Sequence, residues 1–220
     1  MSKRPYNLLV FDWDGTVMDS ESHIVASVLA AIKDLALPER SAFEAKNIIG
    51  LGLREAIQTL YPGSDDQLHD NLIERYRHHF LIANTTPSPL FPGAEALLES
   101  LNNAGYLLAI ATGKGRGGLD RVLEETGLRA MFVTTRCADE SFSKPHPQML
   151  EHIMEFTGCE PDETLMIGDT EYDMEMASNA STHALAVSYG VHELERLQKH
   201  NPVGIIDALT ELQPWLLSRL

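Results

Sequence analysis

The chain carries the stretch Leu8-Leu9-Val10-Phe11-Asp12-Trp13-Asp14-Gly15-Thr16 near its start. Four apolar residues in a row, without alternation, are typical of a strand buried on both faces of a parallel sheet. The two aspartates that follow lie at the carboxyl end of this strand, which is where open parallel sheets bind their ligands. This stretch therefore predicts an α/β fold and also the place of its ligand site.

Further short apolar runs of the same kind follow along the chain: Leu107 to Ala111, Met131 to Val133, Leu165 to Ile167 and Ala184 to Val187. The segments between them have helical spacing, and three of these segments end where a helix C-terminus favours glycine, at Gly105, Gly127 and Gly158. Strands and helices in alternation form βαβ units. The sequence therefore predicts an α/β protein with a Rossmann-like, doubly wound parallel sheet.

The long interval after the first run has helical patterns and no convincing strand. Ile24, Val28 and Ile32 mark one amphipathic helix, and Leu72 and Tyr76 mark another. Residues 19–88 are too many for a simple crossover and suit a small helical module. We expect residues 1–18 and 89–220 to form the α/β core domain, and residues 19–88 to form an inserted α-helical cap domain over the carboxyl edge of the sheet.

The charge balance restricts the partners. The 220 residues include 17 basic and 32 acidic ones, for a net charge of −15. Nucleic acid and anionic membranes are therefore excluded as partners, because a polyanion needs a basic footprint. The first residues lack the long apolar region of a signal peptide, and no apolar run approaches the length of a membrane span. Cys137 and Cys159 form no disulfide framework, and free thiols indicate a reducing compartment, so we expect a cytoplasmic protein.

Carboxylates follow two of the predicted strands. Asp12 and Asp14 follow the first, and Asp169 follows the fourth. Close carboxylates repel each other unless a cation neutralises them, and an all-oxygen set suits Mg²⁺. One aspartate can attack a phosphoryl group while a second donates and accepts the proton. Taken alone, Asp12 to Gly15 also fits an ordinary turn, so the prediction depends on the other strand ends.

Those other strand ends carry polar groups as well. Thr112 and Gly113 precede a predicted helix, where a hydroxyl and free amides form a phosphate cradle. Lys144 precedes a proline and another predicted helix, and Asp173 lies one helical turn after Asp169. An acidic protein that binds an anion needs such local positive charge. We expect Lys114, next to Gly113, to be a solvated surface charge, or else a cation at the mouth of the site.

The four motifs together resemble the haloacid dehalogenase superfamily over residues 7–190. They are Asp12-x-Asp14-Gly15-Thr16-x-x-Asp19-Ser20, Thr112-Gly113, Lys144-Pro145-x-Pro147 and Gly168-Asp169-Thr170-x-x-Asp173. The chain is most similar to the branch with phosphoglycolate phosphatases and β-phosphoglucomutases, which carries a helical cap between the first two motifs. Dehalogenating and phosphonate-cleaving members lack the second aspartate of the first motif, so Asp14 favours phosphate-ester chemistry.

The resemblance implies a role for each matching residue. Asp12 is expected to be the nucleophile and a metal ligand. Asp14 is expected to be the general acid and base, with its backbone carbonyl on the metal, which Asp169 completes. The phosphoryl group is expected to contact the side chains of Thr112 and Lys144 and the backbone amides of Trp13, Asp14 and Gly113. Asp173 is expected to orient the metal site.

These expectations lead to a Mg²⁺-dependent phosphatase that acts on a small phosphorylated metabolite, phosphoglycolate-like or a sugar phosphate, through an aspartyl-phosphate. Two alternatives stay open: a phosphomutase of the β-phosphoglucomutase type, and a non-catalytic protein that binds a phosphorylated metabolite. In the cap, Arg54 either pairs with a carboxylate or second phosphate of the substrate, or begins a helix and points to solvent. The sequence leaves the oligomeric state open.

Overall fold

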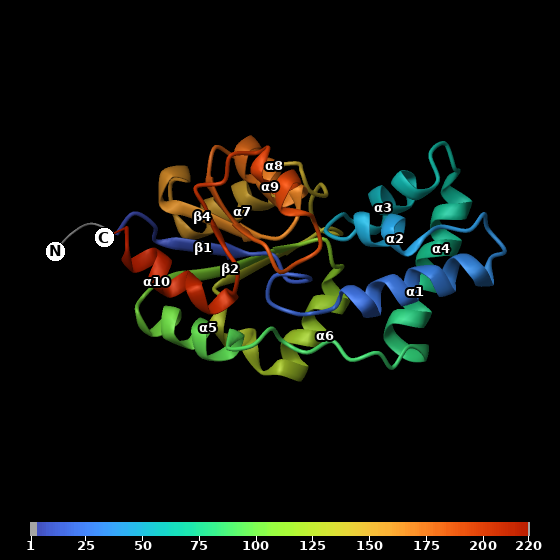
Figure 1. Cartoon of the computed structure of the whole chain (residues 1–220), viewed down its shortest axis with the longest axis horizontal. Coiled ribbons are helices and arrows are strands. Elements are labelled where there is room, and N and C mark those ends of the chain that lie inside the picture. Colours follow the sequence, from blue (N-terminus) through green and yellow to red (C-terminus); the bar gives the residue numbers. More distant parts are fainter. Residues whose placement is uncertain (1–3, 220) are drawn as a thin grey trace.

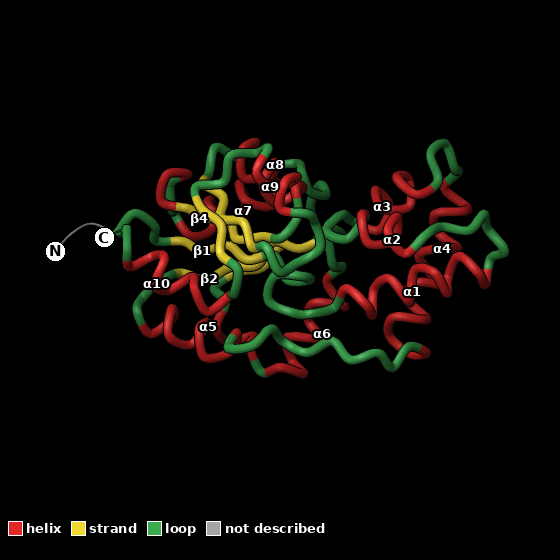
Figure 2. The backbone as a smooth tube through the Cα atoms, viewed as in Figure 1, coloured by secondary structure: helices red, strands yellow, loops and turns green. Residues whose placement is uncertain are grey.

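The computed structural model describes residues 4–219. A sheet of six parallel strands forms its centre, in the order β3-β2-β1-β4-β5-β6 (Figures 1 and 2). The strands are β1 (Leu8–Phe11), β2 (Leu107–Thr112), β3 (Thr134–Cys137), β4 (Thr164–Gly168), β5 (His183–Val187) and β6 (Gly204–Ile206). The predicted Rossmann-like, doubly wound sheet is therefore confirmed. Its strand order reverses between β1 and β4, so the ends of these two strands frame the crevice where such sheets bind ligands.

Helices cover both faces of the sheet, as Figure 1 shows. They are α5 (Ala94–Asn103), α6 (Arg116–Thr126) and α10 (Leu212–Leu217) on one face, and α7 (Gln148–Thr157), α8 (Glu171–Asn179) and α9 (Leu194–Gln198) on the other. The side chains of β1 alternate between the two cores: Leu9 and Phe11 pack in one, Leu8 and Val10 in the other. This double burial is the reason why the first strand is apolar without interruption. Short 3₁₀ segments, η2 (Leu128–Met131), η3 (Pro161–Glu163) and η4 (Leu209–Glu211), complete the core.

The third strand does not lie where we expected it. Met131 ends the segment η2, and β3 begins at Thr134, after the predicted run from Met131 to Val133. β3 lies at the edge of the sheet, and only alternate residues of it are buried. A search for uninterrupted apolar runs cannot find such a strand, and it also missed β6, the opposite edge. The runs that correspond to β1, β2, β4 and β5 were predicted correctly.

Within residues 19–88 the structure forms helices and no strand. They are α1 (Glu21–Asp34), α2 (Ala42–Asn47), α3 (Leu53–Leu60), α4 (Asp66–His78) and the π-helical turn η1 (His79–Ala83). This helical insert, residues 19–88, packs around a third apolar cluster, to which the α/β part contributes one buried residue, Val191. In Figure 1 it lies beyond one end of the sheet.

Two antiparallel linkers connect the helical insert to the sheet. The backbone N–H of Asp19 donates to the carbonyl of Pro89 at 2.8 Å, and that of Phe91 donates to the carbonyl of Val17 at 2.9 Å. The chain thus leaves and re-enters the α/β part at one place, a geometry that suits an inserted module. Of the helices within residues 4–219, none is long and apolar enough to cross a membrane.

Candidate active site

Three buried carboxylates meet at the carboxyl ends of β1 and β4. Asp12 follows β1, Asp169 follows β4, and Asp173 lies in the first turn of α8. One oxygen of each lies within 4.8 Å of the others. β1 and β4 are neighbours in register, with Phe11 opposite Ile167, so the residues that follow them emerge side by side. The structure therefore brings together two of the predicted metal ligands and the residue expected to orient them.

Lys144 reaches the same point from the loop between β3 and α7. Its Nζ lies 2.7 Å from Oδ1 of Asp12 and 2.6 Å from Oδ1 of Asp173, and the side chain is fully buried. Burial by itself lowers the pKa of Lys144, but the charges of Asp12 and Asp173 outweigh it and raise the pKa above its usual value. Lys144 is therefore a fixed positive charge beside Asp12.

The three carboxylates of the acidic cluster have more negative charge than the neighbouring Lys144 can neutralise. Burial raises the pKa of Asp12 well above its usual range, and the neighbouring Asp173 and Asp169 raise it further against the effect of Lys144. Burial and the charge of Asp173 raise the pKa of Asp169 to about 7. Oδ2 of Asp12 has no hydrogen-bond partner among the described residues although it is buried. An oxygen-ligated cation fits this cluster, because it would neutralise the carboxylates and contact the unpartnered oxygen.

Asp169 is held in a fixed orientation. Thr16 donates from its hydroxyl to Oδ1 at 2.8 Å, and the backbone N–H of Val191 donates to Oδ2 at 2.8 Å. Gly15 has a φ of +84°, and a Cβ at that position would lie 2.1 Å from Oδ2 of Asp169. Only glycine combines this backbone conformation with such a close approach. The glycine and threonine of the first motif thus shape the site of Asp169, which follows Thr16 by 153 positions.

Asp173 has contacts on both sides. Its Oδ2 accepts hydrogen bonds from the backbone N–H and the hydroxyl of Thr170, which form a capping box at the start of α8. Its Oδ1 faces Lys144. The helix start therefore fixes the carboxylate, and the carboxylate in turn positions the lysine beside Asp12.

The carboxylate of Asp14 lies apart from the acidic cluster. Ser20 donates from its hydroxyl to Oδ1 at 2.5 Å, and Nζ of Lys114 lies 2.8 Å from the same oxygen. The side chain is nearly buried and lines a cavity above Asp12. Asp14, the residue expected to transfer protons, therefore has its carboxylate outside the group of carboxylates that could hold a metal.

Thr112 and Gly113 lie where the second motif was expected. Thr112 is the last residue of β2 and is fully buried, and its Oγ1 accepts from the backbone N–H of Lys114 at 3.1 Å. Gly113 contacts the helical insert, since a Cβ there would lie 2.6 Å from the carbonyl oxygens of Gly50 and Leu51. Both residues line the cavity that Asp12 and Asp14 also line.

Trp13 packs into the protein core. Its indole is fully buried, and its ring meets Phe132 edge to face at 6.3 Å between centroids. The expected phosphate contact of Trp13 involves its backbone amide and stays a prediction.

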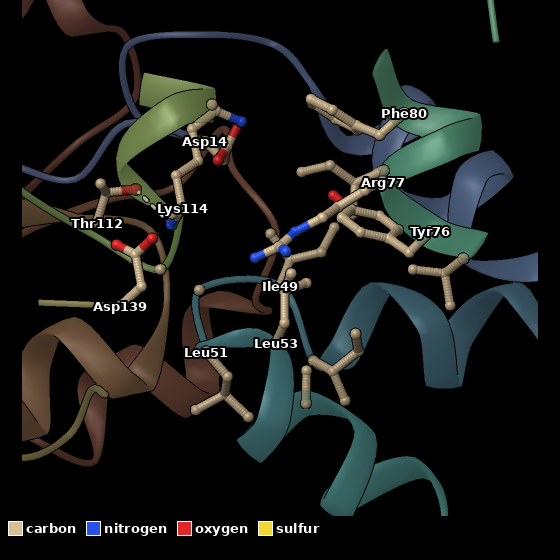
Figure 3. A pocket seen from close by; sticks show the side chains of 18 of the residues that line it. Asp14, Ile49, Leu51, Leu53, Tyr76, Arg77, Phe80, Thr112, Lys114 and Asp139 are labelled. Carbon is tan, nitrogen blue, oxygen red and sulfur yellow. Dashed lines mark hydrogen bonds and ion pairs between the residues drawn. The ribbon is translucent and has the colours of Figure 1, made fainter. Parts of the chain in front are cut away.

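A cavity of about 480 Å³ separates the strand ends from the helical insert (Figure 3). Asp12, Asp14, Thr112, Gly113 and Lys114 line its core side. Apolar residues of α1, α3, α4 and the loop before α3 line its other side. The cavity joins the carboxylates of Asp12 and Asp14 to a large apolar wall, which is the arrangement of a small-molecule site.

Two basic residues near the cavity lie in different environments. Arg54 does not line this cavity: its guanidinium pairs with Asp66 at 3.2 Å and Asp70 at 2.5 Å on α4. It lies in the first turn of α3 and is half-exposed, as in the second of the two alternatives for this residue. Lys114, expected to be solvated, is nearly buried and paired with Asp14. Its place follows from the packing of the insert against the sheet end.

Sequence reasoning missed Arg77 altogether. This residue of α4 lines the cavity, and Figure 3 shows its guanidinium extending into it. A signal was present, because Arg77 lies four residues after Ile73 and therefore falls beside the apolar face of α4.

Known proteins resemble the chain over almost all of its length. It is 33% identical to a protein named "Probable phosphatase IndB" from Dickeya dadantii, over 93% of this chain and 91% of that one. It is 28% identical to a phosphoglycolate phosphatase from Vibrio parahaemolyticus, over 96% of both. The crystal structure of a predicted phosphatase from Clostridium acetobutylicum superposes with a TM-score of 0.87 at 27% identity, over 97% of this chain and 99% of that one.

The sequence profile of the haloacid dehalogenase-like hydrolases matches residues 9–187, a range that contains all four motifs and the whole acidic cluster. The chain belongs to the haloacid dehalogenase-like hydrolase family.

Proposed function

We propose that this hydrolase removes the phosphoryl group from a small phosphorylated metabolite through an aspartyl-phosphate on Asp12. The observation that carries the proposal is the environment of Asp12. Its carboxylate is buried at the base of the cavity, one oxygen faces Lys144, and the other has no partner among residues 4–219. Relatives named phosphatase, phosphoglycolate phosphatase and pyrophosphatase support the same reaction class.

The reaction has two steps. An oxygen of Asp12 attacks the phosphorus, the bond between phosphorus and the ester oxygen breaks, and the leaving oxygen takes a proton from the carboxyl group of Asp14. The ionised Asp14 then takes a proton from water, whose oxygen attacks the same phosphorus. The bond to Asp12 breaks, and phosphate leaves. Lys144 and Thr112 would balance the charge of the phosphoryl oxygens in both steps.

Mg²⁺ is the metal we propose for this site. Asp12, Asp169 and the backbone carbonyl of Asp14 would hold it, and Asp173 would orient them through Lys144. The ion would offset the repulsion between the carboxylate of Asp12 and the substrate's phosphate.

The helical insert would act as a cap over the site. We assign residues 1–18 and 89–220 to the core domain and residues 19–88 to the cap domain. The two adjacent linkers support this division, as does the third apolar cluster, around which the insert packs. The free thiols of Cys137 and Cys159 support a cytoplasmic location.

Phosphate release from a panel of phosphate esters, with Mg²⁺ present, tests the proposal for wild-type protein and Asp12→Asn side by side. We expect release by the wild type alone, because an amide is nearly isosteric with a carboxylate but is a poor nucleophile. Equal release by the variant contradicts the role of Asp12. No release with any ester, together with isomerised substrate, points instead to a phosphomutase.

A further inference from the structure

The wall of the cavity opposite Asp12 is apolar. It is formed by residues of several parts of the insert: Ile24 and Val28 of α1, Ile49 of the loop before α3, Leu53 of α3, Tyr76 of α4 and Phe80 of η1. The rings of Tyr76 and Phe80 stack with their centroids 5.5 Å apart, so part of this wall is aromatic. An apolar part of a ligand would gain binding free energy against such a wall. A sugar would lose it, because some of its hydroxyl groups would have no hydrogen-bond partner there.

The size of the cavity points the same way. Its volume of about 480 Å³ lies within the range of small-molecule sites, roughly 300–1,000 Å³. A two-carbon ester such as phosphoglycolate would leave most of that space to water against apolar side chains. A body the size of an aromatic ring would displace this water and contact the wall.

One cation in the cavity is not neutralised by the protein. Lys114 pairs with Asp14, and Arg121 donates to Glu125 and to the carbonyl of Leu81. Arg77 has no ion pair or hydrogen bond among the described residues, and its guanidinium extends into the cavity (Figure 3). An arginine directed into a ligand cavity in this way suits a carboxylate or phosphate of the ligand.

We infer that the substrate is a phosphate monoester whose alcohol part has an apolar, ring-sized body that ends in a second acidic group. The phosphoryl group lies at Asp12, the body lies along the wall of Tyr76, Phe80 and Leu53, and the acidic group pairs with Arg77. This inference rests on the proposed phosphatase function and adds the class of alcohol to it.

Four phosphate esters of primary alcohols test the apolar ring and the second acidic group separately. Their leaving groups are chemically similar. Ethyl phosphate has neither feature, phosphoglycolate has only the acid, benzyl phosphate has only the ring, and 4-carboxybenzyl phosphate has both. With the Mg²⁺-loaded enzyme we expect 4-carboxybenzyl phosphate to have the highest kcat/KM, about tenfold above benzyl phosphate and more above the two small esters.

Two pairs of variants connect this ranking to the named residues. Arg77→Gln should lower kcat/KM about tenfold for 4-carboxybenzyl phosphate but not for benzyl phosphate. Its control is Arg75→Gln, on the same helix, where Arg75 pairs with Glu74 and does not line the cavity. Leu81 also lines the cavity, and Leu81→Ser should lower kcat/KM about fivefold for both benzyl esters and leave the small esters unchanged. Its control is Ile82→Ser, since Ile82 is 73% exposed and lies outside the cavity lining.

The outcomes separate the two proposals. If kcat/KM for phosphoglycolate or ethyl phosphate equals or exceeds that for 4-carboxybenzyl phosphate, the proposed substrate class is wrong. The phosphatase function would still stand. An Arg77→Gln effect that is equal for both benzyl esters overturns the pairing with the acidic group. Release from none of the esters overturns the phosphatase itself and the substrate class with it.

Discussion

Nζ of Lys114 lies 2.8 Å from Oδ1 of Asp14 and 4.7 Å from the centre of the Phe80 ring. One ammonium thus contacts a carboxylate after β1 and an aromatic ring of the helical insert. The ring of His23, in α1, lies tilted against the same Phe80 ring, with 4.5 Å between the two centroids. Lys114 therefore connects the proposed proton-transfer residue to the wall of the substrate cavity.

Lys114→Met should weaken substrate binding and leave the fold intact. The variant removes a cation from a cavity that receives an anionic ester, so we expect KM to rise about tenfold. Steady-state kinetics with phosphate esters measures this change. The solvent-facing Lys33→Met, at the end of α1, is the control and should keep the wild-type KM. A wild-type KM in Lys114→Met would show that the ammonium serves only to neutralise Asp14.

Asp12→Asn should not destabilise the metal-free protein. Asp12 and Asp173 both pair with the ammonium of Lys144, and Asp169 lies in the same buried cluster, so removal of one negative charge relieves repulsion. A gain of about 1 kcal/mol corresponds to a rise in Tm of roughly 2–4 °C for a chain of this size. Asp14→Asn is the contrasting variant and should lower Tm, because it leaves the buried Lys114 without its partner. A large fall in Tm for Asp12→Asn would contradict this account.

Mg²⁺ should raise the Tm of the wild type and restore activity that EDTA removes. A ligand that binds only the folded state stabilises it, by about 2.7 kcal/mol at one hundred times its Kd. In Asp169→Asn we expect both effects to be lost. Asp139→Asn alters a cavity carboxylate that does not belong to the cluster and should keep the Tm effect. Turnover by EDTA-treated wild-type protein would refute the role of the metal.

Gly113→Ala should lower stability and impair substrate binding. The added methyl group would lie 2.6 Å from two backbone oxygens of the insert, at Gly50 and Leu51, and backbone gives way less easily than a side chain. Gly118→Ala is the matched control for stability, since it lies in α6 with no atom within 4 Å of the new Cβ. We expect it to stabilise the protein by about 0.5 kcal/mol. Thermal denaturation compares the two, and equal Tm values would argue against the close contact at Gly113.

His192 should make the protein less stable in mild acid. Burial and the charge of Arg196 lower its pKa below 6.5, the usual value that the unfolded chain retains. The unfolded state therefore binds the proton more tightly. The stability that neutral His192 contributes is present above pH 6.5 and is lost as the pH falls through the lowered pKa.

Replacement of this histidine tests the linkage. Between pH 7 and pH 5, His192→Gln should lose less Tm than the wild type, because its amide does not titrate. His78→Gln, at an exposed residue of α4, should follow the wild type. An identical fall in Tm for His192→Gln and the wild type would mean that other groups account for the acid sensitivity.

The sequence by itself determined the interior strands and the residues at their ends. β1, β2, β4 and β5 are buried on both faces, so each reads as an unbroken apolar run, and Asp12 and Asp169 follow two of them directly. Parallel strands have their carboxyl ends at one edge of the sheet. For this reason the positions of the aspartates after the apolar runs were enough to predict that they lie close together. The edge strand β3 lacks this signal, because alternate residues of it face outward.

Only the tertiary structure decided which basic residues face the cavity. Lys114 and Arg77 lie in it and Arg54 lies outside, although Arg54 and Arg77 are both charged residues within helices and Lys114 lies just before one. Their positions depend on the angle and distance at which the helical insert packs over the strand ends. That packing is set by contacts between segments far apart in the chain, such as Gly113 with Gly50, and neither periodicity nor motif spacing encodes it.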